Sequence, residues 1–184
     1  APIIPGQRVH SVEEFTDLVT GIKQITRMRI SGTPLCDPDL GSPFILAHEP
    51  DHLQYLPTIT RKAGVITGSI AAPYITQILA ERGGENLVIM VEKEIADLIT
   101  IDDLRTIDLA NLPNAVIIPG RSFVHLSEAE EVLAADGNRR TVLRGPDMLT
   151  ADGETSMGMT YDEVLALELD GFRTLINLIN QWGT

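Results

Sequence analysis

Apolar residues recur at helical spacing near the start of the chain and in short continuous runs after residue 63. Between residues 11 and 25 they return every three or four positions, behind Ser11 and Glu14, which have the spacing of a capping box. This segment is therefore predicted to be an amphipathic helix. The segment 28–31 is predicted to be a short strand, so the chain is expected to begin with one αβ unit.

The next segment, 35–63, is predicted to be a proline-rich linker. Proline removes a backbone donor and restricts the residue before it, so closely spaced prolines exclude a long regular element. One short helix is expected near residues 51–56, and the linker could wrap over a neighbouring surface. The prolines between residues 32 and 63 are Pro34, Pro38, Pro43, Pro50 and Pro57.

From Gly64 onward, continuous apolar runs alternate with segments of helical spacing. Strands that are apolar throughout are typical of parallel sheets covered on both faces. The predicted fold is a small, doubly wound, mostly parallel four-stranded α/β sheet with helices on both faces. The predicted strands are 65–67, 87–91, 115–118 and 142–143. The predicted helices are one that starts at residue 70 and ends near residues 82–84, one at 101–107 capped by Thr100 and Asp103, one capped by Ser127 and Glu130, and a long last one capped by Thr160 and Glu163.

Charge and composition exclude several classes of function. The chain has 26 acidic and 14 basic residues, a formal charge of −12, so a nucleic-acid partner is not expected. Its one cysteine, Cys36, cannot form an internal disulfide or hold an iron–sulfur cluster by itself. No apolar run approaches the length of about 20 residues that spans a bilayer. A cytoplasmic protein with no membrane partner is therefore expected.

Ligands of open parallel sheets bind beyond the carboxyl ends of the strands. Three of the loops expected there contain glycine, and two of these pair it with arginine, which suits a polar, partly anionic organic ligand. The alternative is ordinary loop chemistry at strand ends. The candidate cofactor-binding residues are Thr67, Gly68, Ser69, Gly120, Arg121, Arg144 and Gly145.

Familiar catalytic and metal motifs are missing. The dinucleotide and phosphate-loop glycine patterns and the G-x-S-x-G motif are absent. His48 and His52 have helical spacing, but Pro50 interrupts it, so no metal site is predicted. No catalytic residue is assigned.

Short motifs along almost the whole chain nevertheless resemble one family. The chain is similar to the archaeal methanogenesis-marker, cobalamin-dependent radical SAM proteins, which methylate an arginine of methyl-coenzyme M reductase. The motifs, in order, are residues 2–6, 30–35, 37–38, 41–44, 66–68, 98–103, 118–121, 144–146, 152–154 and 175–177.

The resemblance implies a division of the chain and a function. Residues 1–34 would be the tail of a preceding radical SAM barrel, 35–63 the linker, and 64–184 a Rossmann-like, C-terminal cobalamin-binding domain. S-adenosylmethionine and the [4Fe–4S] cluster would bind elsewhere in the parent protein, so this chain is not expected to be active alone. The partners implied are the radical SAM domain of the same protein and methyl-coenzyme M reductase.

One motif of many cobalamin domains is absent. No histidine lies in a D-x-H-x-x-G pattern, so a histidine of this chain is not expected to ligate the cobalt. Two alternatives to cofactor binding stay open. The chain could be a protein-interaction module of the same parent, or a stand-alone small-molecule enzyme.

Overall fold

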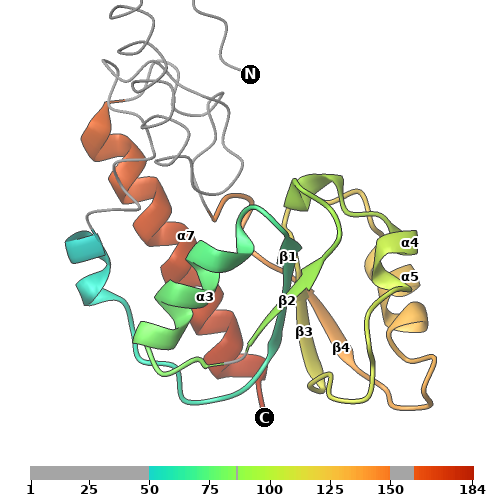
Figure 1. Cartoon of the computed structure of the whole chain (residues 1–184). Coiled ribbons are helices and arrows are strands. Elements are labelled where there is room, and N and C mark those ends of the chain that lie inside the picture. The colour runs from blue at the N-terminus through green and yellow to red at the C-terminus, as the bar shows by residue number, and fades with distance from the viewer. Residues whose placement is uncertain (1–49, 86, 150–159) are drawn as a thin grey trace, which may run out of the picture.

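Four parallel strands form the centre of the protein, as seen in a computed structural model that describes residues 50–85, 87–149 and 160–184 (Figure 1). The strands alternate with helices along the chain, as the apolar pattern predicted. The elements are η2 (Pro50–Tyr55), β1 (Gly64–Gly68), α3 (Ala72–Glu81), β2 (Val88–Val91), η3 (Ala96–Leu98), α4 (Ile101–Leu104), β3 (Ala115–Ile118), α5 (Leu126–Val132), β4 (Thr141–Arg144) and α7 (Tyr161–Trp182).

The strands lie in the order β2-β1-β3-β4, and every neighbouring pair is parallel. All residues of β1 and β3 are buried, because helices cover both faces of these two central strands. The predicted small doubly wound α/β sheet is therefore confirmed. Since the strands are parallel, their carboxyl ends meet at one edge of the sheet, which we call the carboxyl edge.

One face of the sheet is covered by α3 and α7 (Figure 1). Its core includes Phe172, which is fully buried and meets the ring of Tyr74 edge-on with 5.8 Å between ring centroids. The opposite face is covered by α4 and α5 and has a separate apolar core that contains Leu104 and Leu133. The two cores share the sheet, whose side chains point alternately to each.

The part of the expected linker that the structure describes is packed against the first core. Leu53, Leu56 and Ile59 are buried there, so residues 53–63 contribute to the same core as the sheet. The side chain of Asn180 in α7 accepts a hydrogen bond from the N–H of Thr60 at 2.8 Å and donates one to the carbonyl oxygen of Thr58 at 2.9 Å. The expected short helix is present as the 3-10 helix η2. The described part of the expected linker, residues 50–63, therefore packs against the sheet and α7.

The predictions for residues 1–49 lie outside the described residues. These include the amphipathic helix, the strand 28–31 and the tail of a barrel. In the described ranges, no helix is both long and apolar enough to cross a membrane.

Of the four predicted capping boxes, the one of Ser11 and Glu14 lies outside the described residues, and two of the other three are confirmed. Thr100 caps α4 with Asp103, and Thr160 caps α7 with Glu163; in each case the hydroxyl accepts from the N3 N–H, and the N3 carboxylate accepts from the cap N–H. The third, Ser127 with Glu130, is wrong. The N-terminal cap of α5 is His125, and Ser127 already lies in the first helical turn, past the position a capping hydroxyl must occupy.

The bounds of two other helices also differ from their predictions. The helix predicted from residue 70 begins at Ala72, with a proline in its first turn, where the missing N–H is tolerated. Its end at Glu81 agrees with the predicted end near residues 82–84, where Gly83 has a φ of 87° that favours glycine. The helix predicted to reach residue 107 ends at Leu104 and continues as tighter turns, in which Ile107 donates to the carbonyl of Leu104.

Candidate functional site at the carboxyl edge

The order of the strands reverses between β1 and β3, which are neighbours at the centre of the sheet. The connection from β1 to the edge strand β2 contains α3 and covers one face of the sheet. The connection from β3 to the opposite edge strand β4 contains α5 and covers the other face. In doubly wound sheets the loops at the carboxyl ends of the two strands beside such a switch point form the usual ligand crevice. All seven candidate residues lie at the carboxyl ends of β1, β3 and β4.

The loop after β1 is bonded to the loop after β2. The N–H of Ser69 donates to the carbonyl oxygen of Lys93 at 2.7 Å. A Cβ atom on Gly68 would lie only 2.6 Å from the carbonyl oxygens of both Lys93 and Glu94. Gly68 is thus needed because two backbone segments touch there. Thr67 precedes it and is 3% exposed, so its side chain belongs to the interior.

The loops after β3 and β4 pack together in the same way. A Cβ atom on Gly120 would lie 2.7 Å from the carbonyl oxygen of Gly145 and would also collide with that of Pro146. The N–H of Gly145 donates to the carbonyl oxygen of Ile118 at 2.9 Å. Both glycines therefore serve the contact between the two loops, and the close approach that glycine allows is used by the protein backbone.

Arg144 was predicted to contact a ligand, but its guanidinium group turns back onto the loop between β3 and α5. It donates to the carbonyl oxygens of Gly120 at 3.1 Å, Ser122 at 2.9 Å and Val124 at 2.5 Å. One planar donor group thus binds the carbonyl oxygens of three alternate residues of this loop. The structure gives Arg144 the role of a clamp that positions the loop carrying Arg121 and Phe123.

The remaining cations of this edge are also paired. Arg121 lies 3.7 Å from a carboxylate oxygen of Asp97, and Lys93 lies 3.4 Å from one of Asp103. Hydrogen bonds from Thr100, with the nearby Lys93 ammonium group, lower the pKa of the Asp103 carboxyl, which stays ionised at neutral pH. A ligand dominated by phosphate would have to displace these carboxylates, so the edge suits such a ligand poorly.

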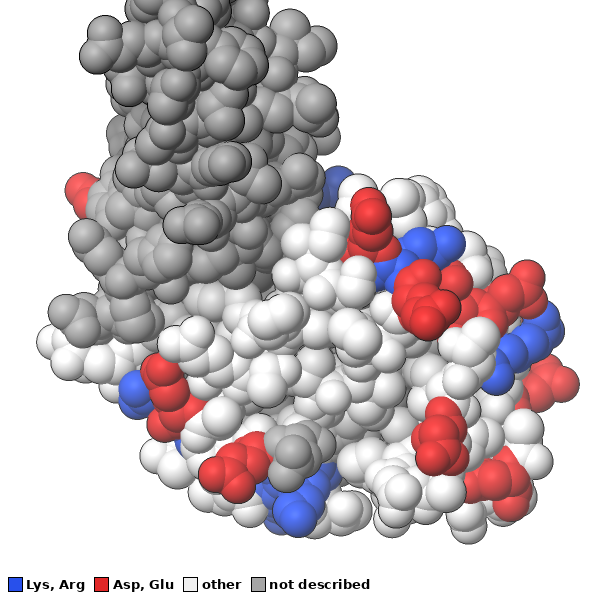
Figure 2. All heavy atoms as spheres, in the orientation of Figure 1, with Lys and Arg blue, Asp and Glu red and all other residues white. Residues whose placement is uncertain are grey.

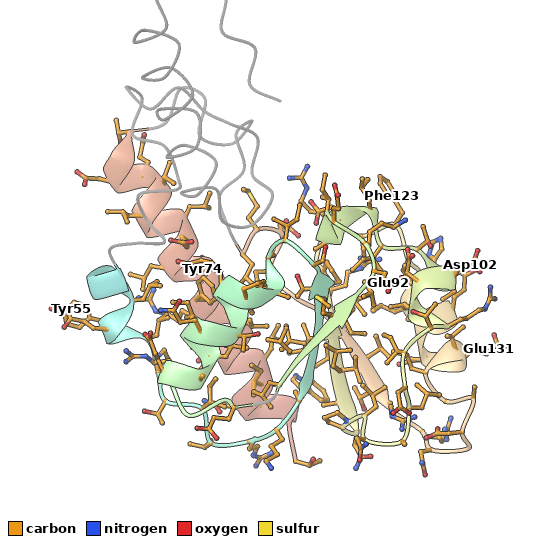
Figure 3. All side chains as sticks on the ribbon, viewed as in Figure 1. Tyr55, Tyr74, Glu92, Asp102, Phe123 and Glu131 are labelled. Atoms are coloured by element: carbon orange, nitrogen blue, oxygen red, sulfur yellow. The ribbon has the colours of Figure 1, made fainter. Side chains whose placement is uncertain are left out.

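The loops that carry these ion pairs also carry exposed apolar side chains. Phe123 is 88% exposed, Leu98 is 53% exposed and Ile95 is 48% exposed. Phe123 extends outward beyond the ends of the strands (Figure 3). The ion pair between Arg121 and Asp97 brings the loop with Phe123 beside η3, which ends at Leu98. We call Ile95, Leu98 and Phe123 the apolar rim.

The position of the strand ends predicts loops that the structure does place at one edge of the sheet, but it does not select the residues of the apolar rim. The prediction selects glycine and arginine for their chemistry, whereas the side chains that face solvent at this edge include Phe123 and Leu98. One signal was available in the sequence, since Phe123 follows Gly120 closely in a chain with only 4% aromatic residues. An aromatic residue in a strand-end loop, with no helical or strand pattern around it, is a candidate for contact with a ligand.

The structure offers little to a metal ion in its described ranges. Residues 50–85, 87–149 and 160–184 contain no group of three or more His, Cys, Asp or Glu side chains placed to hold one. His125 is exposed at the start of α5. Cys36, His10 and His48 lie outside the described residues.

No protein-family model matches the chain, and no curated protein is detectably similar to it.

Proposed function

We propose that the carboxyl edge binds cobalamin, and that the chain is the C-terminal, cytoplasmic cobalamin-binding domain of a radical SAM methyltransferase that C-methylates an arginine of methyl-coenzyme M reductase. The observation that carries the proposal is the apolar rim beside the switch point of the sheet, with Phe123 88% exposed. The resemblance of the sequence motifs to that family supplies the identity of the ligand and of the parent enzyme.

The chemistry of the edge is compatible with a corrin. A corrin ring is wide, has largely apolar faces and carries neutral amide groups at its margin. The apolar rim offers contact to such a face, and the loops around Ser69 and Arg121 offer backbone and side-chain polar groups for the amides. Because Arg144 is bonded to carbonyl oxygens and Arg121 lies beside Asp97, the edge favours a ligand with little charge.

The cysteine content of the chain limits which cofactors of the proposed parent enzyme it can hold. When bound, cobalamin would supply methyl transfer to carbon. With one cysteine in the whole chain, the three thiolates that hold a radical SAM cluster must come from elsewhere in the parent. The residues of this chain would bind and orient the corrin and would exclude water from one side of it. No histidine of the chain has the spacing of a cobalt-ligating motif.

Equilibrium dialysis of the full chain against hydroxocobalamin, read from the visible spectrum, tests the proposal. We expect saturable binding with a Kd below about 100 µM. The double variant Leu98→Ser/Phe123→Ser removes two apolar side chains and should weaken binding at least about tenfold. Tyr55→Ser is the matched control, because Tyr55 is 76% exposed and lies on η2, away from the carboxyl edge (Figure 3).

Either of two results would contradict cobalamin binding at this edge: no saturable uptake by the unmodified chain, or equal binding by the rim variant and the control. If the unmodified chain binds cobalamin and the rim variant binds it equally well, the corrin binds at another surface of the protein.

The exposed Phe123 also favours a second candidate function, docking of a protein partner. Exposed aromatic residues are frequent anchors of protein interfaces. In that case the rim variant would lose binding to purified methyl-coenzyme M reductase or to the radical SAM domain, while the chain would take up no cobalamin. Biolayer interferometry with each of these two proteins distinguishes the candidates.

A further inference from the structure

A groove lies between α4 and α5 on the outer side of the sheet face that these helices cover. Its volume is about 510 Å³. Leu104, 1% exposed, forms its floor, and half-buried apolar side chains form its walls. The half-buried wall residues are Ile101, Ile107, Leu109 and Val132.

The rim of this α4–α5 groove is acidic. Glu128 and Glu131 line it from α5, and both are exposed. Arg105 lines it from the other side, but its guanidinium group forms an ion pair with Asp102. Asp102 and Glu131 both lie on the flank formed by α4 and α5 (Figure 3), where Figure 2 shows several acidic side chains with basic ones among them. The unbalanced charge at the mouth of the groove is therefore negative.

An apolar groove with acidic side chains at its mouth suits one class of ligand. We propose that the α4–α5 groove binds a basic amphipathic helical segment of a partner protein. Apolar side chains at positions i, i+3 and i+4 of that segment would fill the groove, and lysine or arginine side chains beside them would pair with Glu128 and Glu131.

Other occupants fit the groove less well. Small-molecule sites bury most of the ligand around a few converging polar groups, whereas the charged side chains that line this groove stand on its exposed rim. Nucleic acid is disfavoured by the acidic rim. The groove shares no residue with the apolar rim at the carboxyl edge, so this proposal is independent of cobalamin.

A pair of peptides tests the proposal with the full chain. Both are fluorescein-labelled 16-residue helical peptides with the same leucine positions at i, i+3, i+4 and i+7; one carries lysine beside the leucines and the other carries glutamate. We expect saturable binding of the lysine peptide, measured by fluorescence anisotropy, at least about tenfold tighter than that of the glutamate peptide. Raising the NaCl concentration from 50 mM to 500 mM should weaken it, because exposed charge pairs are screened.

Variants of the chain locate the binding. Glu128→Gln/Glu131→Gln should weaken the lysine peptide about tenfold, whereas Glu81→Gln/Glu130→Gln, with the same change in net charge at exposed positions off the groove, should leave its affinity within about twofold. Val132→Asp should weaken it at least as much as the first pair. Circular dichroism and thermal unfolding confirm that each variant is folded.

Three outcomes would overturn the proposal. The lysine peptide could fail to bind with a Kd below about 1 mM, the two peptides could bind equally, or the two double variants could lose the same affinity. Equal losses would show that the peptide senses the net charge of the protein and not the groove.

Discussion

On one face of the sheet, α7 runs for 22 residues beside the 10-residue α3, whereas α4 and α5, which cover the opposite face, have only four and seven residues. The first face buries Phe172, Leu175, Ile176 and Ile179 completely along one side of α7. The second leaves Ile101, Ile107 and Val132 half-buried around a groove. Helices as short as α4 and α5 cannot cover a strand layer fully, so apolar surface remains beside them.

The two faces of the sheet are therefore expected to have different roles, one in stability and one in recognition. Among the described residues, the core on the face with α3 and α7 has 17 buried apolar residues, including Phe172, whereas the core on the opposite face has 11, and burial of apolar side chains dominates the folding free energy. The face with α4 and α5 has less surface to bury, and its exposed parts are open to contact with other molecules. Stability is therefore expected to depend mainly on the first face, and recognition on the second face and on the carboxyl edge.

Phe172→Ala is expected to have the largest effect. Phe172 is fully buried and packs edge-on against Tyr74, so its removal leaves a cavity between α3 and α7. The free energy of unfolding should fall by about 4 kcal/mol. Val132→Ala, on the other face, removes a half-buried side chain and should lower it by about 1 kcal/mol or less. Urea unfolding at pH 7 measures both; equal losses would contradict the assignment of stability to the first face.

Arg140→Met tests whether a polar anchor compensates for the thin cover of the second face. The side chain of Arg140 is only 2% exposed, and it donates to the carbonyl oxygens of Leu133 and Leu109 and to the carboxylate of Asp136. Since Leu109 is also a wall of the α4–α5 groove, this side chain ties that wall to the end of α5.

The variant leaves buried carbonyl groups and a carboxylate without their donor, so the free energy of unfolding should fall by about 3 kcal/mol. Arg139→Met is the control, because Arg139 is exposed next to it; its effect should stay within about 0.5 kcal/mol. Similar urea midpoints for the two variants would show that Arg140 adds no net stability.

The sheet could be predicted well from the sequence, because its strands are short runs of apolar residues bounded by glycine and proline. Ala115–Ile118 is a strand with the predicted bounds, and β1 extends one residue beyond the prediction at each end. The signal is local and strong, since a strand buried on both faces must be apolar throughout. The start of α5 was missed because it depends on contacts distant in sequence: Arg144 bonds to the carbonyl of Val124 just before the helix.

The candidate site could be predicted only as far as its position. Parallel strands bring their carboxyl ends together, and this property of the topology places residues 67–69, 120–121 and 144–145 at one edge. Which side chains face solvent there is decided by tertiary packing. The charge of Arg144 predicts contact with a ligand, yet its guanidinium group is bonded to backbone carbonyl oxygens of the neighbouring loop, and the apolar side chain of Phe123 is among those left exposed.

The smallest expected effect is on the free energy of unfolding in acid. It involves the capping boxes of α7 on one face and of α4 on the other. Hydrogen bonds from Thr160 lower the pKa of the Glu163 carboxyl from its ordinary value of 4.5, and those from Thr100, with Lys93, lower that of Asp103 from 3.8. A carboxyl with a lower pKa in the folded state binds protons more readily when unfolded. Its contribution to stability is therefore complete above its ordinary pKa and is lost as the pH falls further.

The free energy of unfolding should thus decrease below about pH 4.5, and Glu163→Gln and Asp103→Asn should each reduce the steepness of that decrease. Urea unfolding between pH 7 and pH 2.5 measures the slopes, with Asp162→Asn, exposed in the first turn of α7, as the control. Because α7 covers the larger core, Glu163→Gln should act on unfolding of the whole domain. Asp103→Asn should act mainly on hydrogen exchange around α4, which is four residues long and can open locally. If both variants instead changed only global unfolding, and by equal amounts, the two faces would unfold as one unit, and the contrast between a stabilising face and a recognition face would be one of geometry alone.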